Sequence, residues 1–494
     1  MIELCRDRAC STVIETVRVV GSSARPSVAL PPSSTVFWRA RARVGAVDDR
    51  PSEVGPTWLF HTPVRDNTSA IDSSSTPHAD FNGDGFDDIA VGSPGRVIGG
   101  MWVGSVSVFH GSRTGLGASA NLVVDGGIAN DSFGRHLATT GDVNGDGYSD
   151  LAVASARNSW IFYGGASGLR SPAAVELGEA VVSTAGDVNA DGFADVLHES
   201  TASGLRVLFG SAAGIATAAG QTISFPPHVL GRRFFNSDLG PNVTGDSSAH
   251  AGDVDGDGFG DIVTRVARPA STAYYVLVFH GTIHGIATHP QIIDPPIGNY
   301  LYWGAVVAGG GDLNGDGLSD LLVSATVNYA CVMAYFGAPI RITSEGSGTP
   351  SCSASSSASS IPRLGSGDLN GDGYSEAIVS LMDTHVNSPS LLYRAGTVIA
   401  FPGAAAPNWR TPLWQAFGST TAALFGAAIS GGDVNGDGFG DLVVGVPTFP
   451  DPTSLTPGSV SVFHGSASGL GPAPSRVLTG APLELFGVSI AGTR

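Results

Sequence analysis

The nonapeptide Asp80-Phe81-Asn82-Gly83-Asp84-Gly85-Phe86-Asp87-Asp88 decides the fold, because its pattern occurs seven times in a chain of 494 residues. The pattern is D-x-[DN]-x-D-G-[FYL]-x-[DE], and position 6 is Gly in every copy. Successive copies begin 45 to 66 residues apart, the later ones at Asp142, Asp187, Asp253, Asp312, Asp368 and Asp433. Self-similarity with a period of this size indicates an architecture built from repeated supersecondary units.

Each copy carries the side chains of a cation-binding loop. Oxygen ligands at positions 1, 3, 5 and 9 can converge on one hard cation, and the backbone carbonyl at position 7 can add another. Glycine at position 6 permits the sharp turn that wraps the backbone around the ion. Ca²⁺ accepts six to eight oxygens flexibly whereas Mg²⁺ requires a strict octahedron, so the sequence predicts up to seven calcium ions. The alternative is that the seven segments are solvated turns without a metal.

The predicted calcium ligands occupy positions 1, 3, 5, 7 and 9 of each loop. They are Asp80, Asn82, Asp84, Phe86 and Asp88; Asp142, Asn144, Asp146, Tyr148 and Asp150; Asp187, Asn189, Asp191, Phe193 and Asp195; Asp253, Asp255, Asp257, Phe259 and Asp261; Asp312, Asn314, Asp316, Leu318 and Asp320; Asp368, Asn370, Asp372, Tyr374 and Glu376; and Asp433, Asn435, Asp437, Phe439 and Asp441. These positions hold 22 of the 43 acidic residues, and they account for the net charge of −18. The acidity therefore indicates metal ligands, and it argues against a nucleic-acid partner.

Strand patterns surround every loop. Short apolar runs such as Leu151-Ala-Val153 and Leu442-Val-Val444 follow the loops, as strands do. Position 12, where an EF-hand needs a bidentate Glu, is never acidic, so the loops are not EF-hands. A further apolar segment then ends in a Gly turn, as in Val106-Ser-Val108-Phe109-His-Gly111. Three or four short strands in each of seven units predict an all-β fold, a seven-bladed β-propeller with calcium-binding loops.

These segments resemble FG-GAP repeats, which occur in the amino-terminal propeller of integrin α subunits and in many bacterial surface or secreted proteins. The resemblance rests on Phe-Gly pairs such as Phe133-Gly134 and Phe425-Gly426, on the Asp-rich loops, and on strand ends such as Val444-Gly-Val-Pro447. It covers about 415 of the 494 residues. The third, fourth and sixth units lack a clean Phe-Gly pair and no Arg-Gly-Asp occurs, so integrin-like ligand recognition is not carried over.

The two ends of the repeat region predict how the propeller closes. Phe425 precedes the loop at Asp433 by eight residues, and Phe486 stands the same distance before Arg494. We therefore expect strand 487–492 to complete the sheet that follows Asp80, so that the propeller spans 78–494 and leaves no exposed sheet edge. A truncated eighth blade is the alternative.

Residues 1–66 have a different character. The run Val36-Phe-Trp38-Arg-Ala-Arg-Ala-Arg43 alternates as a half-exposed strand does, and Trp58-Leu-Phe60 follows it as a closing strand. Their order resembles the C-terminal half of a fibronectin type III or immunoglobulin-like domain, which predicts a partial β segment at 1–66 and a polar linker at 67–77. We expect the missing half and a signal peptide to lie upstream of Met1. The cysteines form two local pairs, Cys5/Cys10 and Cys331/Cys352, which suit disulfides in an oxidising compartment.

The remaining sequence predicts recognition and not catalysis. No apolar stretch of about 20 residues occurs, so no transmembrane segment is expected, and Gly-x-Ser-x-Gly is absent. We expect a monomeric, calcium-stabilised, extracellular or cell-surface module that binds an unknown protein or glycan ligand at a propeller face. The alternatives are a structural surface spacer and a glycan- or lipid-acting enzyme or lectin.

Overall fold

The chain consists of strands and turns wherever its structure is defined. The computed structural model describes residues 1–6, 10–17, 26, 30, 34–41, 54–62, 78–200, 203–218, 220–225, 248–268, 271, 273–295, 302–326, 330–339, 342, 351–352, 362–387, 391–407, 409–448 and 456–493. All seven loops lie inside these ranges, whereas the predicted linker at 67–77 lies outside them. The described residues contain no helix, so the all-β prediction is confirmed and none of them forms a membrane-spanning helix.

Seven four-stranded antiparallel sheets follow one another through the described residues from 78 onward. They are, from inner to outer strand: β38 (Ile490–Ala491), β5 (Ile89–Ser93), β8 (Ser105–Phe109) and β9 (Leu122–Asp125); β10 (His136–Gly141), β11 (Asp150–Ala154), β12 (Ser159–Phe162) and β13 (Val175–Gly178); β14 (Val181–Gly186), β15 (Asp195–Ser200), β16 (Gly204–Leu208) and β17 (Gln221–Thr222); β18 (Ser248–Gly252), β19 (Asp261–Ala267), β20 (Tyr274–Phe279) and β23 (Gln291–Ile293); β24 (Val307–Gly311), β25 (Asp320–Thr326), β26 (Ala330–Tyr335) and β27 (Ser351–Cys352); β28 (Arg363–Gly367), β29 (Glu376–Leu381), β32 (Thr397–Phe401) and β33 (Trp414–Phe417); and β34 (Ile429–Gly432), β35 (Asp441–Val446), β36 (Ser459–Phe463) and β37 (Arg476–Thr479).

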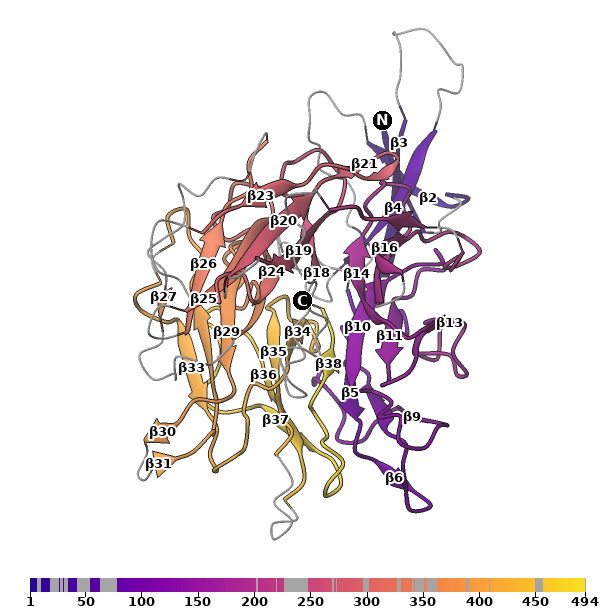
Figure 1. Ribbon diagram of the computed structural model, residues 1–494. Coiled ribbons are helices and arrows are strands. Elements are labelled where there is room, and N and C mark those ends of the chain that lie inside the picture. The colour runs from indigo at the N-terminus through magenta and orange to yellow at the C-terminus, as the bar shows by residue number, and fades with distance from the viewer. Residues whose placement is uncertain are drawn as a thin grey trace, which may run out of the picture.

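Three short hairpins extend from these sheets. They are β6 (Val97–Ile98) with β7 (Met101–Trp102), β21 (Gly281–Thr282) with β22 (Gly285–Ile286), and β30 (Val386–Asn387) with β31 (Leu391–Leu392). The first and third hairpins join the second and third strands of their sheets. They therefore lie at the end of the propeller away from the Asp-rich loops, which join the first and second strands (Figure 1).

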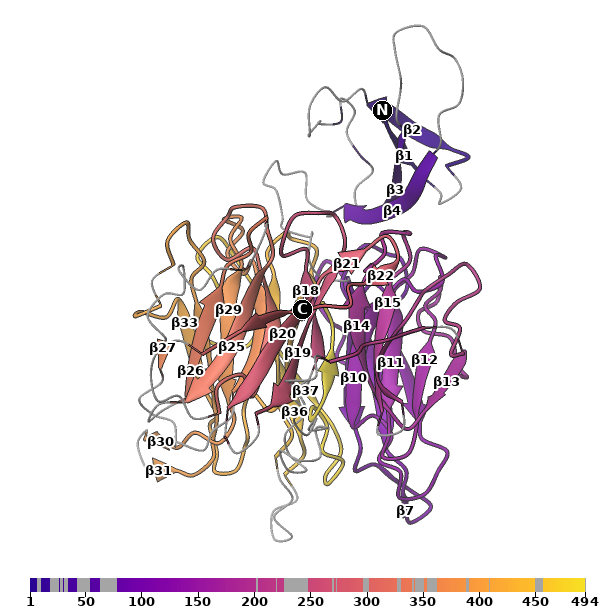
Figure 2. The same cartoon turned by 45° about the horizontal axis from the view of Figure 1, so that its top comes forward.

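The inner strands arrange the sheets as the blades of a propeller. Strands β10, β14, β18, β24, β28, β34 and β38 each contact the next in this order, and β38 contacts β10. The sheets consequently stand side by side around one axis (Figures 1 and 2). Each blade buries its apolar faces against its neighbours, as where Val91 of β5 packs with Val443 and Val460 of the preceding blade. The core is therefore a series of layers between blades.

The first blade combines both ends of the repeat region. Its inner strand β38 pairs with β5 in antiparallel register, Ile490 opposite Val91 and Ala491 opposite Ala90. The Gly92 amide donates to the Ser489 carbonyl at 2.9 Å, and Phe486 is buried in the same layer. A sheet built in this way links the first repeat to the last without leaving an unpaired inner edge on β5.

The amino-terminal residues form a separate small sheet in the order β2-β1-β3-β4, with bounds Val13–Val17, Ile2–Cys5, Ser34–Arg41 and Val54–Thr62. Cys5 and Cys10 form a disulfide beside the buried Phe37. This sheet stands over the end of the propeller that carries the Asp-rich loops (Figure 2). A Cβ added to Gly147 in the second loop would lie 3.3 Å from Cζ of Phe37, so the two parts meet there.

The second cysteine pair lies in the fifth blade. Cys331 on β26 is disulfide-bonded, and it stands opposite Cys352 in the antiparallel register of β26 and β27. Among the described cysteines none is free, which agrees with the oxidising compartment that the sequence predicts.

Candidate metal centres

In six of the seven blades an Asp-rich loop joins the innermost strand to the second strand. The loop at 142–150, for example, connects β10 to β11, and the same connection recurs in five other blades; in the first blade the loop at 80–88 leads into β5, while the inner strand β38 comes from the other end of the repeat region. The second strand begins at position 9 of the loop in six of the seven copies, so a buried strand anchors the last predicted ligand. All seven loops therefore lie at one end of the propeller.

Backbone amides orient the carboxylate at position 1. In the first loop Oδ1 of Asp80 accepts from the amides of Gly83 at 2.6 Å and Asp84 at 3.2 Å, and Oδ2 accepts from Gly85 at 2.8 Å. The bonds from positions 5 and 6 recur in the other six loops. The chain thus wraps around this carboxylate, and the positive φ of Gly83 and Gly85 allows it to do so.

The other predicted side-chain ligands are held in the same loop. The side-chain oxygen at position 3 accepts from the amide of position 5, and that at position 5 accepts from the amide of position 7, in every copy. The buried carboxylate at position 9 accepts from the amide of position 2, as Asp88 does from Phe81 at 2.9 Å. Each loop therefore fixes its oxygen side chains around its own turn, and in the fourth loop Asp253, Asp255 and Asp257 offer oxygens within 4.8 Å of one another. Oxygen side chains are the ligands that Ca²⁺ prefers.

The side chain at position 7 has a role that the sequence does not reveal. It is half-buried in every loop and lies outside the core. In four blades it lies across the Gly at position 4 of the preceding loop; a Cβ on Gly83 would meet the Tyr148 ring at 2.6 Å. Leu318, Tyr374 and Phe439 cover Gly256, Gly315 and Gly371 in the same manner. In these four loops Gly at position 4 therefore leaves room for a side chain of the next blade, whereas the third loop has Ala190 at this position.

The loops are also the joints between blades. The amide of position 8 donates to the carbonyl of position 1 in the preceding loop in all seven cases, for example Ser149 to Asp80 at 2.9 Å. A second amide, one residue beyond the Gly turn that ends the third strand, donates to the carbonyl of position 2, as Gly165 does to Phe81. The ring closes when Asp87 and Ser112 donate to Asp433 and Val434. Whatever holds a loop in shape therefore holds two blades together.

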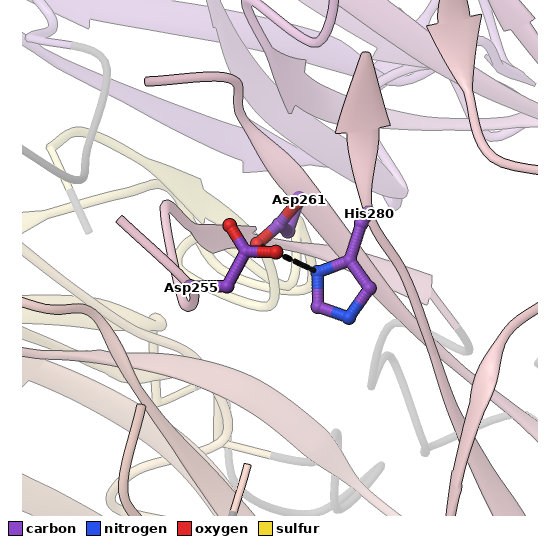
Figure 3. Close-up of side chains that lie close together, drawn as sticks. All are labelled: Asp255, Asp261 and His280. Atoms are coloured by element: carbon purple, nitrogen blue, oxygen red, sulfur yellow. Dashed lines mark ion pairs between the residues drawn. The ribbon is translucent and has the colours of Figure 1, made fainter. Parts of the chain in front are cut away.

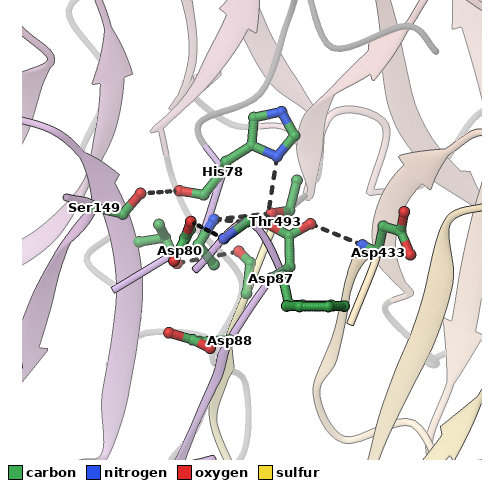
Figure 4. Close-up of polar contacts among 12 residues, drawn as sticks. His78, Asp80, Asp87, Asp88, Ser149, Asp433 and Thr493 are labelled. Atoms are coloured by element: carbon green, nitrogen blue, oxygen red, sulfur yellow. Dashed lines mark hydrogen bonds and ion pairs between the residues drawn. The ribbon is translucent and has the colours of Figure 1, made fainter. Parts of the chain in front are cut away.

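One loop carries an additional buried carboxylate at the closure. Asp87, at position 8, accepts from the amides of Ala79 at 3.1 Å and Asp433 at 2.7 Å, and it pairs with Nδ1 of His78 at 3.3 Å (Figure 4). The Ala79 amide also donates to Oγ1 of Thr493 at 3.0 Å. The neighbouring His78 imidazole and the backbone amides outweigh burial and lower the pKa of Asp87 to about 2. We call His78, Asp87, Asp433 and Thr493 the closure cluster.

The predicted ligands themselves repel one another. Burial, followed by the neighbouring carboxylates, raises the pKa of Asp80 to about 6, of Asp433 to about 7 and of Glu376 to about 8. The same causes raise the pKa values of Asp88, Asp150, Asp195 and Asp441 well above the ordinary range. Clustered buried carboxylates of this kind need a compensating cation, so the residues present fit a bound calcium ion.

These raised pKa values predict how pH acts on the metal-free protein. Because the folded state binds protons more tightly than the unfolded chain, its stability rises as pH falls from about 8 towards 4 and is lost as pH rises through the folded pKa values. We expect a higher melting temperature at pH 6 than at pH 8 once calcium has been removed. Protons and Ca²⁺ compete for the same carboxylates. The calcium concentration needed for half-saturation should therefore rise about tenfold as the pH falls from 8 to 6. A metal-free protein that melts lower at pH 6 would contradict this electrostatic account.

Comparison with known proteins places four of the seven loops, those at Asp80, Asp142, Asp187 and Asp433, in a known repeat. The FG-GAP repeat family matches residues 74–109 and 425–463, and the FG-GAP-like repeat family matches residues 142–198. Human integrin alpha-7 is 38% identical over 113 residues, which are 22% of this chain and 9% of that protein. Human integrin alpha-6 is 33% identical over 133 residues, 25% of this chain and 10% of that protein. Integrin alpha-PS5 of Drosophila melanogaster is 36% identical over 104 residues, 20% of this chain and 10% of that protein.

A solved structure was also matched. The rhamnogalacturonan lyase PL11 of Bacillus licheniformis aligns with 96% of this chain and 64% of its own, at 11% identity and a TM-score of 0.27. The segments of this chain that match the three integrin relatives span only about a tenth of the length of those relatives. The predicted resemblance is confirmed by the repeat families and by the integrin similarity together. The chain is an FG-GAP repeat protein whose repeats are similar to those of integrin α subunits.

Proposed function

We propose that the chain is a calcium-stabilised, non-catalytic recognition module that works outside the cell. The observation that carries the proposal is that seven loops, each with oxygen side chains fixed by its own backbone amides, are also the hydrogen-bonded joints between neighbouring blades. Calcium at such a loop holds its backbone in shape and so fixes the carbonyls that the next blade uses. Extracellular modules bind calcium with dissociation constants on the order of 0.1–1 mM, which cytosolic calcium would leave empty.

The calcium in this proposal stabilises the scaffold and takes no part in a reaction. Asp80 and its equivalents at position 1 hold the ion and, through their carbonyls, also accept the bond from the following blade. The carboxylates at position 9 connect the ion to the second strand. A rigid ring then presents the connections at its other end to a partner.

The partner-binding face that we propose is the end opposite the loops. The amino-terminal sheet stands over the loop end, whereas large apolar side chains are exposed at the opposite end. Trp102 is 63% exposed and Met101 52% exposed on the β6–β7 hairpin, and Tyr393 is 56% exposed next to β31. These side chains stand on two different blades at this end, and exposed Trp, Tyr and Met side chains are typical of protein interfaces. A protein ligand therefore suits this face better than a glycan.

Replacement of Trp102 tests the location of the binding face. The W102A variant is expected to weaken partner binding by about 2 kcal/mol or more, because a central Trp commonly contributes that much to an interface. Ile283 is 71% exposed at the loop end of the propeller, so I283A provides a matched control. The unmodified protein, W102A and I283A are each screened on arrays of extracellular proteins and of glycans. Two results would contradict the assignment of this face. The first is that W102A and I283A weaken the same interaction equally, and the second is that the protein binds a glycan and W102A leaves that binding intact.

An axial cavity at the inner strands supports the non-catalytic part of the proposal. It encloses about 110 Å³ and is lined by residues of all seven inner strands, with no carboxylate among them. Its two histidines hold inner strands together: Nε2 of His136 donates to the Val182 carbonyl at 3.1 Å and Nδ1 of His250 to the Ala185 carbonyl at 2.9 Å. These ring nitrogens are therefore engaged in contacts between blades. A hydrolase screen with calcium present tests this part, and turnover abolished by substitution at this cavity would overturn it.

A further inference from the structure

The fourth loop differs from the other six in both sequence and geometry. Its position 3 is Asp255, where every other copy has Asn, so four carboxylates meet in this loop. His280, which follows strand β20, turns its ring towards them (Figure 3). Nδ1 of His280 lies 3.1 Å from Oδ2 of Asp255 and 3.4 Å from Oδ2 of the fully buried Asp261. A nitrogen ligand from outside the loop is thus added to an oxygen site.

Two observations indicate that this nitrogen is placed for a metal. The Nδ1 atom is buried and faces two carboxylate oxygens, one from Asp255 and one from Asp261, with which it forms ion pairs. Ligands bound at about 2.0–2.2 Å to one tetrahedral or octahedral ion lie roughly 2.9–3.5 Å apart, which the two measured separations match. Asp253 and Asp257 bring further oxygens within 4.8 Å of Asp255.

We propose that the fourth loop is a mixed nitrogen and oxygen site for a divalent transition-metal ion, with His280, Asp255 and Asp261 as ligands. An imidazole nitrogen is a preferred ligand of Zn²⁺ and other late first-row ions such as Ni²⁺, whereas Ca²⁺ takes oxygen ligands. The remaining six loops, with Asn at position 3, keep the all-oxygen set. The inference deepens the proposed function, because it rests on the same kind of loop but assigns a different metal to one of them.

Two equivalent histidines provide internal controls. His110 and His464 follow the third strands of the first and seventh blades in the same Phe-His-Gly sequence. Their rings instead lie against the neighbouring blade: Nε2 of His110 is 2.5 Å from a Cβ built on Gly168, and Nε2 of His464 is 2.7 Å from one on Gly115. The inward rotation of the histidine thus accompanies the Asp at position 3. It is a property of the fourth loop and not of the Phe-His-Gly sequence.

The experiment titrates Co²⁺ into the full chain in the presence of millimolar Ca²⁺ and follows the visible ligand-field absorption. The unmodified protein is expected to bind one equivalent of Co²⁺ with a nitrogen-ligand spectrum. H280Q should bind this ion at least roughly tenfold more weakly. D255N, which restores the Asn of the other six loops, should also lose it, whereas H110Q should bind as the unmodified protein does. Thermal melting with Ca²⁺ verifies that each variant is folded.

Two results would overturn the proposal. The first is Co²⁺ binding that is unchanged in H280Q, and the second is no binding of Co²⁺ to the unmodified protein in competition with Ca²⁺. A rise in calcium affinity in H280Q without any Co²⁺ site would identify His280 as a charge partner of Asp255 and would reject the ligand role. The calcium dependence of melting in H280Q tests the proposed function separately, because the six other loops are unchanged.

Discussion

Removal of calcium is expected to lower the melting temperature of the protein by about 10 °C. At a tenfold excess over its dissociation constant, each occupied loop stabilises the folded state by about 1.4 kcal/mol. The six loops with Asn at position 3 therefore contribute roughly 8 kcal/mol, which is comparable to the whole stability of many domains. With an unfolding entropy of about 2 cal/mol/K per residue, a propeller of about 415 residues loses roughly 10 °C.

The measurement is a calorimetric melt in millimolar Ca²⁺ and again after exhaustive chelation. Added Ca²⁺ should restore the original melting temperature, and Mg²⁺ at the same concentration should restore it only in part because Mg²⁺ requires an octahedral site. Since each loop joins two blades, the metal-free protein should also melt over a wider range of temperature. A melting curve that chelation leaves unchanged would show that the ring is held without metal.

The second large effect is expected at the closure cluster. In D87A the amides of Ala79 and Asp433 and the ring of His78 lose their shared acceptor in a buried site. Loss of a buried acceptor with one charged partner typically costs about 3 kcal/mol or more. Because these bonds join the first loop to the last, we expect the free energy of unfolding to fall by that amount.

The control for D87A is a variant at the same position of another loop. Ser375 occupies position 8 in the sixth loop, is buried, and donates from its amide to the Asp312 carbonyl as Asp87 does to Asp433. S375A preserves that backbone bond and should alter the free energy of unfolding by less than about 1 kcal/mol. Denaturant unfolding in Ca²⁺ compares the two variants. Similar losses in both would mean that Asp87 has no special part in closing the ring.

The sequence predicts the loops and the propeller because both depend on local residue order. Position 1 and its three amide donors lie within six residues, as Asp80 and Gly85 illustrate, so the pattern itself specifies the turn. The strands that follow are apolar runs bounded by Gly, and a repeat of such units closes into a ring. The similarity to integrin repeats agrees with this interpretation.

The sequence does not predict the hydrogen bonds and side-chain contacts between blades. The bond from Ser149 to Asp80 is a backbone bond, and no residue type marks it. The contact between Tyr148 and Gly83 joins residues 65 positions apart, and its only trace is the unexplained Gly at position 4. The orientation of His280 towards Asp255 does not follow from the Phe-His-Gly sequence, because His110 and His464 share that sequence and lie against a neighbouring blade. The sequence does mark Asp87, because it is the only acidic residue at position 8 among the seven loops.

The central claim is that all seven loops hold a divalent cation, calcium in the six with Asn at position 3, and so lock the blades together. A crystal structure determined from protein kept in millimolar Ca²⁺, with anomalous diffraction measured, tests this claim most directly. We expect a strong anomalous peak enclosed by positions 1, 3, 5 and 9 in each of the six loops with Asn at position 3, and a metal peak in the fourth loop as well. Loops that keep the same geometry but enclose only water would contradict the account.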